Sequence, residues 1–213
     1  MKIKVCGLNN AENISELAQL PIDMAGIIFY PKSPRNFTLE VADLEVLTEN
    51  DVNRVGVMVN PQMDEVINRV HDYELDFVQL HGDENPMFCA EIKRLWSLST
   101  IRSAKIIKAF SIDDDFDFNA TNEFQRYVDL FLFDTKGAQR GGNGKTFNWE
   151  KLREYQGMTP FLLSGGIRLE HAAQIRKLNV PQLYGVDINS GFESEAGVKK
   201  VAEVQKFVEL LKN

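Results

Sequence analysis

The sequence predicts an α/β fold: a single-domain (β/α)8 TIM barrel with minimal decoration that spans residues 1–213. Short apolar runs rich in β-prone residues alternate with helical stretches along the whole chain, and eight such pairs indicate this barrel. Most of the runs are apolar at consecutive positions, as is typical of strands covered on both faces. A chain of 213 residues can bury a proper core but is short for this fold, so we expect few insertions.

The predicted strands are short, apolar and followed by polar or glycine-containing segments. They cover residues 3–6, 24–30, 54–59, 77–80, 105–110, 130–134, 161–164 and 183–188. The competing architecture is an open, doubly wound sheet. The number of strands and the lack of a glycine fingerprint after the first strand disfavour that alternative.

Helical segments are predicted between the strands and after the last one. They cover residues 11–19, 39–49, 61–72, 86–96, 113–127, 149–155, 169–178 and 197–211. Asn9 and Asn10 are candidate N-caps for the first segment, and Thr38 is one for the second. Pro61 and Pro86 begin the next two, at a position where the missing N–H of proline has no cost. The apolar residues of the last segment recur at near-helical spacing and predict a stripe that faces the core.

Composition limits the partners that we expect. A formal net charge of −7 argues against a nucleic-acid surface, which needs clustered Lys and Arg to neutralise phosphates. No stretch approaches the length of a membrane span, and the apolar run at the N-terminus is too short for a secretory signal. Cys6 and Cys89 lie far apart without a metal-like spacing, so we expect no disulfide, no metal site and a cytoplasmic protein.

In such a barrel the active site is built where the strands end. Cys6 ends the first predicted strand and Asp134 ends the sixth, so both point to the same rim. A thiolate there could act as base or nucleophile, although an isolated cysteine is more often a small buried hydrophobe. A carboxyl group after an apolar run is desolvated, which favours its protonated form and suits a general acid. Its alternative role is a hydrogen-bonding loop residue.

Two further side chains follow strands at this rim. Arg35 comes after the second strand in a loop stiffened by two prolines, and its guanidinium could clamp a carboxylate. A surface arginine is the plainer alternative. His81 ends the fourth strand and could equally have a structural role or contact a substrate.

Glycine-rich segments follow the last two strands, where barrels often bind phosphate. Gly165 and Gly166 follow the seventh strand, and Ser190 and Gly191 follow the eighth. Glycines let backbone N–H groups approach an anion closely, so we expect a phosphate site rather than simple tight turns.

A third glycine-rich segment, residues 141–146, ends in Gly-Lys-Thr and suggests nucleotide binding. That motif needs a glycine five residues before Gly144, where Gln139 stands. We therefore expect a flexible loop that folds over a substrate.

Over nearly its whole length the chain resembles the phosphoribosylanthranilate isomerases of tryptophan biosynthesis. The resemblance rests on Lys-Val-Cys-Gly at 4–7, Phe-Tyr-Pro-Lys-Ser-Pro-Arg at 29–35, Val-Gln-Leu-His-Gly at 78–82, Asp-Thr-Lys at 134–136, Gly-Gly-Asn-Gly-Lys-Thr-Phe at 141–147, Leu-Ser-Gly-Gly at 163–166 and Val-Asp-Ile-Asn-Ser-Gly at 186–191. Asn189 departs from an expected serine but keeps a polar group. Phe192 replaces a smaller aliphatic residue.

The resemblance implies a cofactor-free Amadori rearrangement of N-(5-phosphoribosyl)anthranilate to 1-(2-carboxyphenylamino)-1-deoxyribulose 5-phosphate. Asp134 would be the general acid and Cys6 the general base. Arg35 would hold the anthranilate carboxylate, and Asp187 and His81 would contact the rest of the substrate. The glycine loops would bind the phosphate. The expected partner is thus a phosphorylated small molecule, and we expect a monomer, with a homodimer as the alternative.

Two other classes of function compete with this interpretation. One is a different phosphate-binding barrel enzyme, such as a sugar-phosphate epimerase or indoleglycerol-phosphate synthase. The synthase needs a catalytic lysine on an early strand, and we expect Lys4 to flank the barrel wall instead. The other is a barrel that only binds a phosphorylated regulator, which would need neither Cys6 nor Asp134. A free thiol has a pKa of about 8.5, so a base at Cys6 predicts a local lowering of that pKa or a proton-coupled route.

Overall fold

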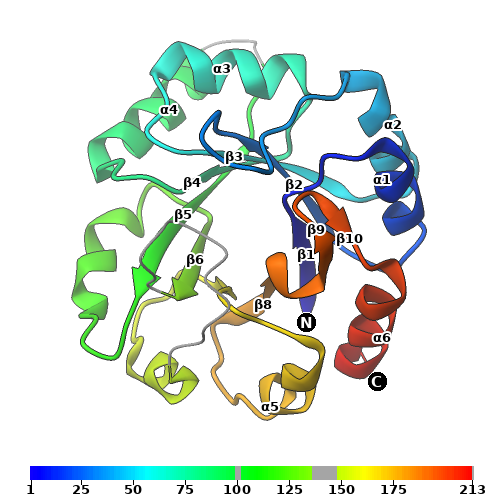
Figure 1. The fold of residues 1–213 in the computed structure, drawn as a ribbon. Coiled ribbons are helices and arrows are strands. Elements are labelled where there is room, and N and C mark those ends of the chain that lie inside the picture. Colours follow the sequence, from blue (N-terminus) through cyan, green and yellow to red (C-terminus); the bar gives the residue numbers. More distant parts are fainter. Residues whose placement is uncertain (99–101, 136–147, 213) are drawn as a thin grey trace.

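The computed structural model describes residues 1–98, 102–135 and 148–212, and these form a closed parallel barrel. Figure 1 shows the ring of strands with helices around its outside. The barrel strands are β1 (Lys2–Cys6), β2 (Met24–Phe29), β3 (Asn53–Met58), β4 (Phe77–Leu80), β5 (Lys105–Ile112), β6 (Leu130–Thr135), β7 (Phe161–Leu163) and β8 (Leu183–Ile188). They pair in sequence order and β1 closes the ring against β8, so the predicted barrel is confirmed.

Regular helices connect the strands of the first half of the barrel. They are α1 (Ala11–Ala18), α2 (Glu45–Glu49), α3 (Met63–Asp72) and α4 (Pro86–Leu98), with a 3-10 turn, η1 (Val41–Leu44), before α2. Asn10 caps α1, because its side chain accepts a hydrogen bond of 2.9 Å from the Asn13 N–H. Pro86 begins α4 as predicted.

Two predicted helix starts are wrong. The N-cap of η1 is Glu40, and the Thr38 N–H instead binds Asn9 Oδ1 at 2.9 Å, which ties this loop to the one after β1. Helix α3 begins two residues after Pro61, with Gln62 as its N-cap.

The second half of the barrel is connected mainly by 3-10 turns. These elements are η2 (Phe118–Phe124), η3 (Trp149–Glu154) and η4 (Leu169–His171), the last leading into the short α5 (Ala172–Arg176). Strand β8 runs through η5 (Ser190–Phe192) into a small hairpin of β9 (Glu193–Glu195) and β10 (Val198–Lys199). The final helix, α6 (Val201–Lys212), therefore starts later than the predicted residue 197. Gly197, at φ +91°, forms the turn of the hairpin instead.

The core has two layers. The larger lies between strands and helices and includes Ile3 and Val5 of β1. The smaller lies inside the barrel and consists of buried side chains from the strands alone: Met24, Val55, Phe77, Ile107, Ala109, Leu130, Leu132 and Leu162. Because side chains alternate along a strand, the intervening residues of β1, Lys4 and Cys6, face the barrel interior. In the described part of the chain, no helix is long and apolar enough to cross a bilayer.

Candidate active site

A cavity of about 550 Å³ opens at the carboxyl ends of the strands. All nine residues predicted for the site line it: Cys6, Arg35, His81, Asp134, Gly165, Gly166, Asp187, Ser190 and Gly191. They follow six different strands and come together because parallel strands all present their carboxyl ends to one rim. Residues 136–147, which hold the predicted flexible loop and Lys136, lie outside the described residues.

Lys4 is fully buried inside the barrel next to Asp187, which lines the cavity, contrary to the expectation that it flanks the barrel wall. Its ammonium group donates to Asp187 Oδ1 at 2.9 Å, and both side chains are buried. Since Lys4 precedes Cys6 by two positions in one strand, both face the interior, and that spacing was the signal that could have revealed its place. A Cβ atom on Gly26 would lie 2.7 Å from Cys6 Sγ and 3.0 Å from Lys4 Nζ, so only a glycine leaves room for both groups there.

The electrostatics of Cys6 differ from the prediction. Burial raises the pKa of the Cys6 thiol, and the charge and hydrogen bond of Lys4 reverse only part of that effect. Of the two expected alternatives, this direction disagrees with the lowering, because desolvation outweighs the nearby ammonium, and leaves the proton-coupled route as the prediction. Burial likewise raises the pKa of Asp187, again opposed by Lys4. Burial alone would lower the pKa of Lys4, but Asp187 and Cys6 together raise it.

Asp134 and His81 face each other across the site. His81 Nε2 lies 3.5 Å from Asp134 Oδ2, and Gln79 Nε2 lies 2.8 Å from His81 Nδ1. With the Gln79 amide donating to Nδ1, the neutral imidazole carries its proton on Nε2, toward Asp134. The Gln79 side chain is buried, and its Oε1 has no hydrogen-bond partner among the described residues. Gln79 thus fixes which ring nitrogen of His81 faces the carboxyl group.

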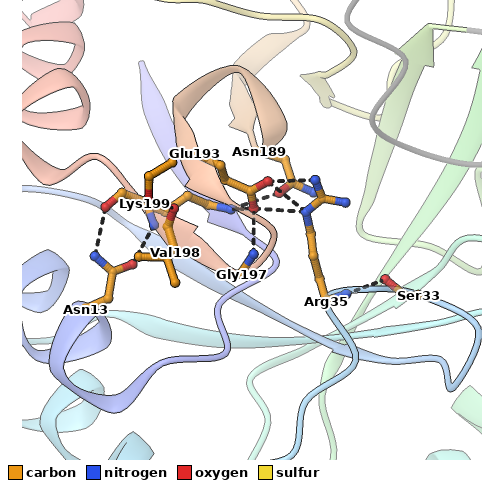
Figure 2. A network of polar contacts seen from close by, with 9 residues as sticks. Asn13, Ser33, Arg35, Asn189, Glu193, Gly197, Val198 and Lys199 are labelled. Atoms are coloured by element: carbon orange, nitrogen blue, oxygen red, sulfur yellow. Dashed lines mark hydrogen bonds and ion pairs between the residues drawn. The ribbon is translucent and has the colours of Figure 1, made fainter.

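Arg35 is not a free surface residue. Its Nε and Nη2 donate to Glu193 of β9, the shortest of these contacts being 2.6 Å from Nη2 to Oε2. The ammonium group of Lys199, in β10, donates to the same carboxylate (Figure 2). Hydrogen bonding to Glu193 raises the pKa of Arg35. Neither Glu193 nor Lys199 was predicted, since residue 199 was assigned to a helix and both acquire their partners only when the hairpin folds back onto the site.

The two glycine loops meet at the far side of the cavity. Gly165 and Gly166 adopt positive φ values of 92° and 64°, which favour glycine. A Cβ atom on Gly191 would lie 2.1 Å from the Ile167 carbonyl oxygen, so the loops after β7 and β8 pack directly together. The N–H groups of Gly165 and Gly166 make no hydrogen bond within the described residues. Those of Ser190 and Gly191 begin a helical turn and have no partner inside it.

The arrangement combines a buried thiol, a carboxyl group, a guanidinium and two glycine loops in one cavity. This set suits acid–base chemistry on a phosphorylated molecule that carries a second anionic group. Within the described residues, no three His, Cys, Asp or Glu side chains gather in an arrangement that could hold a metal ion.

Comparison with known proteins agrees with this chemistry. The family model for N-(5'-phosphoribosyl)anthranilate (PRA) isomerase matches residues 3–210. The chain is 41% identical to the N-(5'-phosphoribosyl)anthranilate isomerase of Parabacteroides distasonis, over 98% of this chain and 92% of that protein. The phosphoribosyl anthranilate isomerase of Thermotoga maritima superposes with a TM-score of 0.83 at 28% identity, covering 100% of this chain and 98% of that one.

A further structure holds such an isomerase in complex with reduced 1-(o-carboxyphenylamino)-1-deoxyribulose 5-phosphate. It is 25% identical, with a TM-score of 0.77 over 100% of this chain and 98% of that one. The family and the fold therefore agree. The chain belongs to the N-(5'-phosphoribosyl)anthranilate isomerase family, enzymes that catalyse an isomerisation in tryptophan biosynthesis.

Proposed function

We propose that the cavity carries out the family's isomerisation, an Amadori rearrangement, with Asp134 as general acid and Cys6 as general base. The observation that carries this proposal is that both groups line one cavity together with a guanidinium and two glycine loops. The substrate is N-(5-phosphoribosyl)anthranilate, and a relative's complex with a reduced product analogue supports this choice. The product is 1-(2-carboxyphenylamino)-1-deoxyribulose 5-phosphate.

The reaction begins with ring opening. Asp134 gives its proton to the ribose ring oxygen, the bond from C1 to that oxygen breaks, and the nitrogen lone pair forms a protonated Schiff base at C1. Cys6 then removes the proton from C2, and the electrons of that bond pass through C1 to the nitrogen, which gives an enolamine. A proton then adds at C1 while the C2 hydroxyl group loses its proton, which converts the enolamine to the aminoketone product. These two proton transfers balance the proton that Asp134 gave and the proton that Cys6 took, so both groups return to their starting states. One acid and one base suffice for these steps.

The thiol needs help to act as a base, because burial raises its pKa. In this proposal the ammonium group of Lys4 stabilises the thiolate at the moment it forms, as a fixed charge in a site of low dielectric. Asp187 holds Lys4 through their 2.9 Å ion pair and so keeps the ammonium next to the sulfur. This makes Lys4 part of the catalytic machinery.

Charged groups at the two ends of the cavity position the substrate. Arg35 binds the anthranilate carboxylate, and His81 and Asp187 contact the middle of the molecule. The N–H groups of Gly165, Gly166, Ser190 and Gly191 bind the phosphate. Fixing both ends in this way aligns C1 and C2 with the acid and the base. One copy of the chain supplies all these residues, so the proposal works for a monomer and equally for a homodimer.

The test compares the wild type with Asp134→Asn in a fluorescence assay that follows loss of the anthranilate signal from freshly made phosphoribosylanthranilate. We expect the variant to lose activity by about 10²- to 10⁴-fold, the usual contribution of a general acid. Asp129→Asn is the matched control, since Asp129 precedes the same strand at the opposite end of the barrel, where it pairs with Lys93. The control should keep its activity.

No loss of signal with the wild type would contradict the substrate. Full activity of Asp134→Asn would contradict the role of Asp134 as general acid but not the proposed substrate.

A further inference from the structure

The polar cluster around Glu193 has a geometry that goes beyond a simple ion pair. A guanidinium group has two edges that can bind a carboxylate through paired hydrogen bonds: the side edge of Nε and Nη2, and the end edge of Nη1 and Nη2. Glu193 occupies the side edge of Arg35, at 2.9 and 3.0 Å from Nε and 2.6 Å from Nη2. Nη1 makes no hydrogen bond within the described residues and points away from Glu193 in Figure 2. The end edge is therefore available on a residue that lines the cavity.

Several contacts hold the Glu193 carboxylate itself in place. Its Oε1 accepts from the Gly197 N–H at 3.2 Å and from the Lys199 ammonium group, which also donates to Asn189 Oδ1 at 2.9 Å. The hairpin is tied to α1, because Asn13 exchanges hydrogen bonds of 2.7 and 2.9 Å with the backbone of Lys199. Figure 2 shows this chain of contacts from Asn13 through Lys199 to Arg35. Glu193 thus connects Arg35 to a rigid part of the barrel.

The charges of the cluster explain why it contains a lysine. Arg35 and Glu193 alone form a neutral pair, which has little attraction for an anion. A protonated Lys199 brings the sum to +1 in a largely buried place next to the cavity. Burial lowers the pKa of Lys199, and the charge and hydrogen bond of Glu193 oppose that lowering. Burial would raise the pKa of Glu193, but hydrogen bonds and charges of Arg35 and Lys199 lower it on balance, so the carboxylate stays ionised. A substrate carboxylate brings the cluster to neutrality.

We propose that Glu193 is a positioning residue that presents the end edge of Arg35 to the substrate's carboxylate, with Lys199 supplying the positive charge that keeps the cluster attractive to an anion. This inference rests on the proposed role of Arg35 and makes the cluster the determinant of specificity for a carboxylated aromatic amine. Gly7 belongs to the same arrangement, since a Cβ atom there would lie 2.7 Å from Arg35 Cδ.

The experiment measures the dissociation constants of two probes by titration calorimetry. One is reduced 1-(o-carboxyphenylamino)-1-deoxyribulose 5-phosphate, and the other is the same molecule without the carboxyl group. We expect the wild type to prefer the carboxylated probe by about 10- to 100-fold, the range of a charge-assisted hydrogen-bonded pair. Glu193→Gln should reduce this preference to less than about threefold, with a raised KM and a kcat that changes little.

The direction in which binding of the carboxylated probe changes distinguishes two roles of Glu193: positioning Arg35, or competing with the substrate for Arg35. Glu193→Gln raises the charge of the cluster to +2, so if Glu193 only competed with the substrate for Arg35, the variant would bind the carboxylated probe more tightly. That result would overturn the proposal, and so would an unchanged preference. Equal binding of both probes by the wild type would instead contradict the proposed role of Arg35 itself.

Two other variants guard against a loss of folding. Arg35→Lys keeps the charge and can still pair with Glu193, but lysine has no second edge, so the preference should fall as in Glu193→Gln. Glu84→Gln is the matched control, because Glu84 is an equally buried carboxylate paired with Lys108 at another part of the rim. It should lower stability and leave the preference between the two probes intact. If Arg35→Lys still prefers the carboxylated probe, the proposal that Glu193 and the substrate bind different edges of Arg35 would be overturned.

Discussion

Each of the two cysteines of this chain lies beside a buried lysine–carboxylate pair, but we expect a catalytic role for one pair and a structural role for the other. Cys6 lies beside Lys4 and Asp187, whose ion pair is 2.9 Å long. Cys89 lies near Lys108 and Glu84, whose ion pair is 2.8 Å long. Residue types, burial and distances are almost the same. The two regions differ in the groups that surround the lysine ammonium group.

The ammonium group of Lys108 is saturated. Its three protons meet three acceptors: the Leu80 carbonyl at 3.3 Å, the Gly82 carbonyl at 2.8 Å and Glu84 at 2.8 Å. Lys4 has the Asp187 carboxylate and the Cys6 thiol, and this thiol opens onto the cavity. Cys89 instead belongs to the apolar core between strands and helices. An ion pair whose ammonium protons all have acceptors holds loops in place. An ion pair beside a cavity whose ammonium group has fewer acceptors can stabilise negative charge that develops on a substrate or a thiol.

Replacing Lys4 tests the catalytic side of this comparison and has the largest expected effect. Lys4→Met should lower kcat/KM by about 10²-fold or more, since the thiolate loses the nearest charge that stabilises it. The limb of the pH–rate profile that belongs to Cys6 should move to higher pH, because Lys4 is the main group that lowers the thiol pKa. Activity is measured per folded molecule, with folding checked by circular dichroism. An unmoved limb would show that Lys4 serves only the packing of the barrel.

Replacing Lys108 tests the structural side. Lys108→Met leaves Glu84 as a buried carboxylate without its cation, which typically lowers the free energy of unfolding by about 3–5 kcal/mol. Because none of the proposed chemistry uses Lys108, the pH–rate profile at a temperature where the variant is folded should match that of the wild type. Urea denaturation gives the first quantity and the fluorescence assay the second. A shifted profile would break the distinction between the two regions.

The thiol of Cys89 predicts a smaller effect at alkaline pH. Burial raises its pKa from 9.0 to about 11. Between these two values the folded state holds a proton that the unfolded state has released, so stability falls as the pH rises through this window. The slope is at most about 1.4 kcal/mol per pH unit for one group. Cys89→Ala should flatten the slope of unfolding free energy between pH 9 and 11 and leave it unchanged below pH 8. Equal slopes in both proteins would contradict the raised pKa.

The strands were predictable from the sequence because each is a short apolar run that is buried by its neighbours whatever their detail. Strands β4 and β8 match their predicted limits, and β5 extends two residues further, to Ile112. The connections were less predictable in the second half. Residues 113–127 were assigned to a helix, but they form only the 3-10 turn η2, in which Phe118 and Phe124 pack into the core. Tertiary packing decided the form of that segment.

The positions of the site residues were predictable because they follow strands, but their electrostatic partners were not. Glu193 meets Arg35 across 158 residues of sequence, and Lys199 meets Asn13 across 186. No local sequence pattern predicts pairs that lie so far apart in the chain. The raised pKa of Cys6 has the same origin, since it depends on how completely the closed barrel excludes water from β1.

The closure of β1 against β8 has a consequence for the order in which the protein is made. Lys4 is synthesised before its partner Asp187, which lies 183 positions later in the chain. Until β8 has been synthesised, the ammonium group lacks its partner Asp187 and the proposed phosphate loop after β8 is missing. If Cys6 is the base as proposed, a growing chain cannot use it before β8 is made, and enzymatic activity then depends on the last strand being in place.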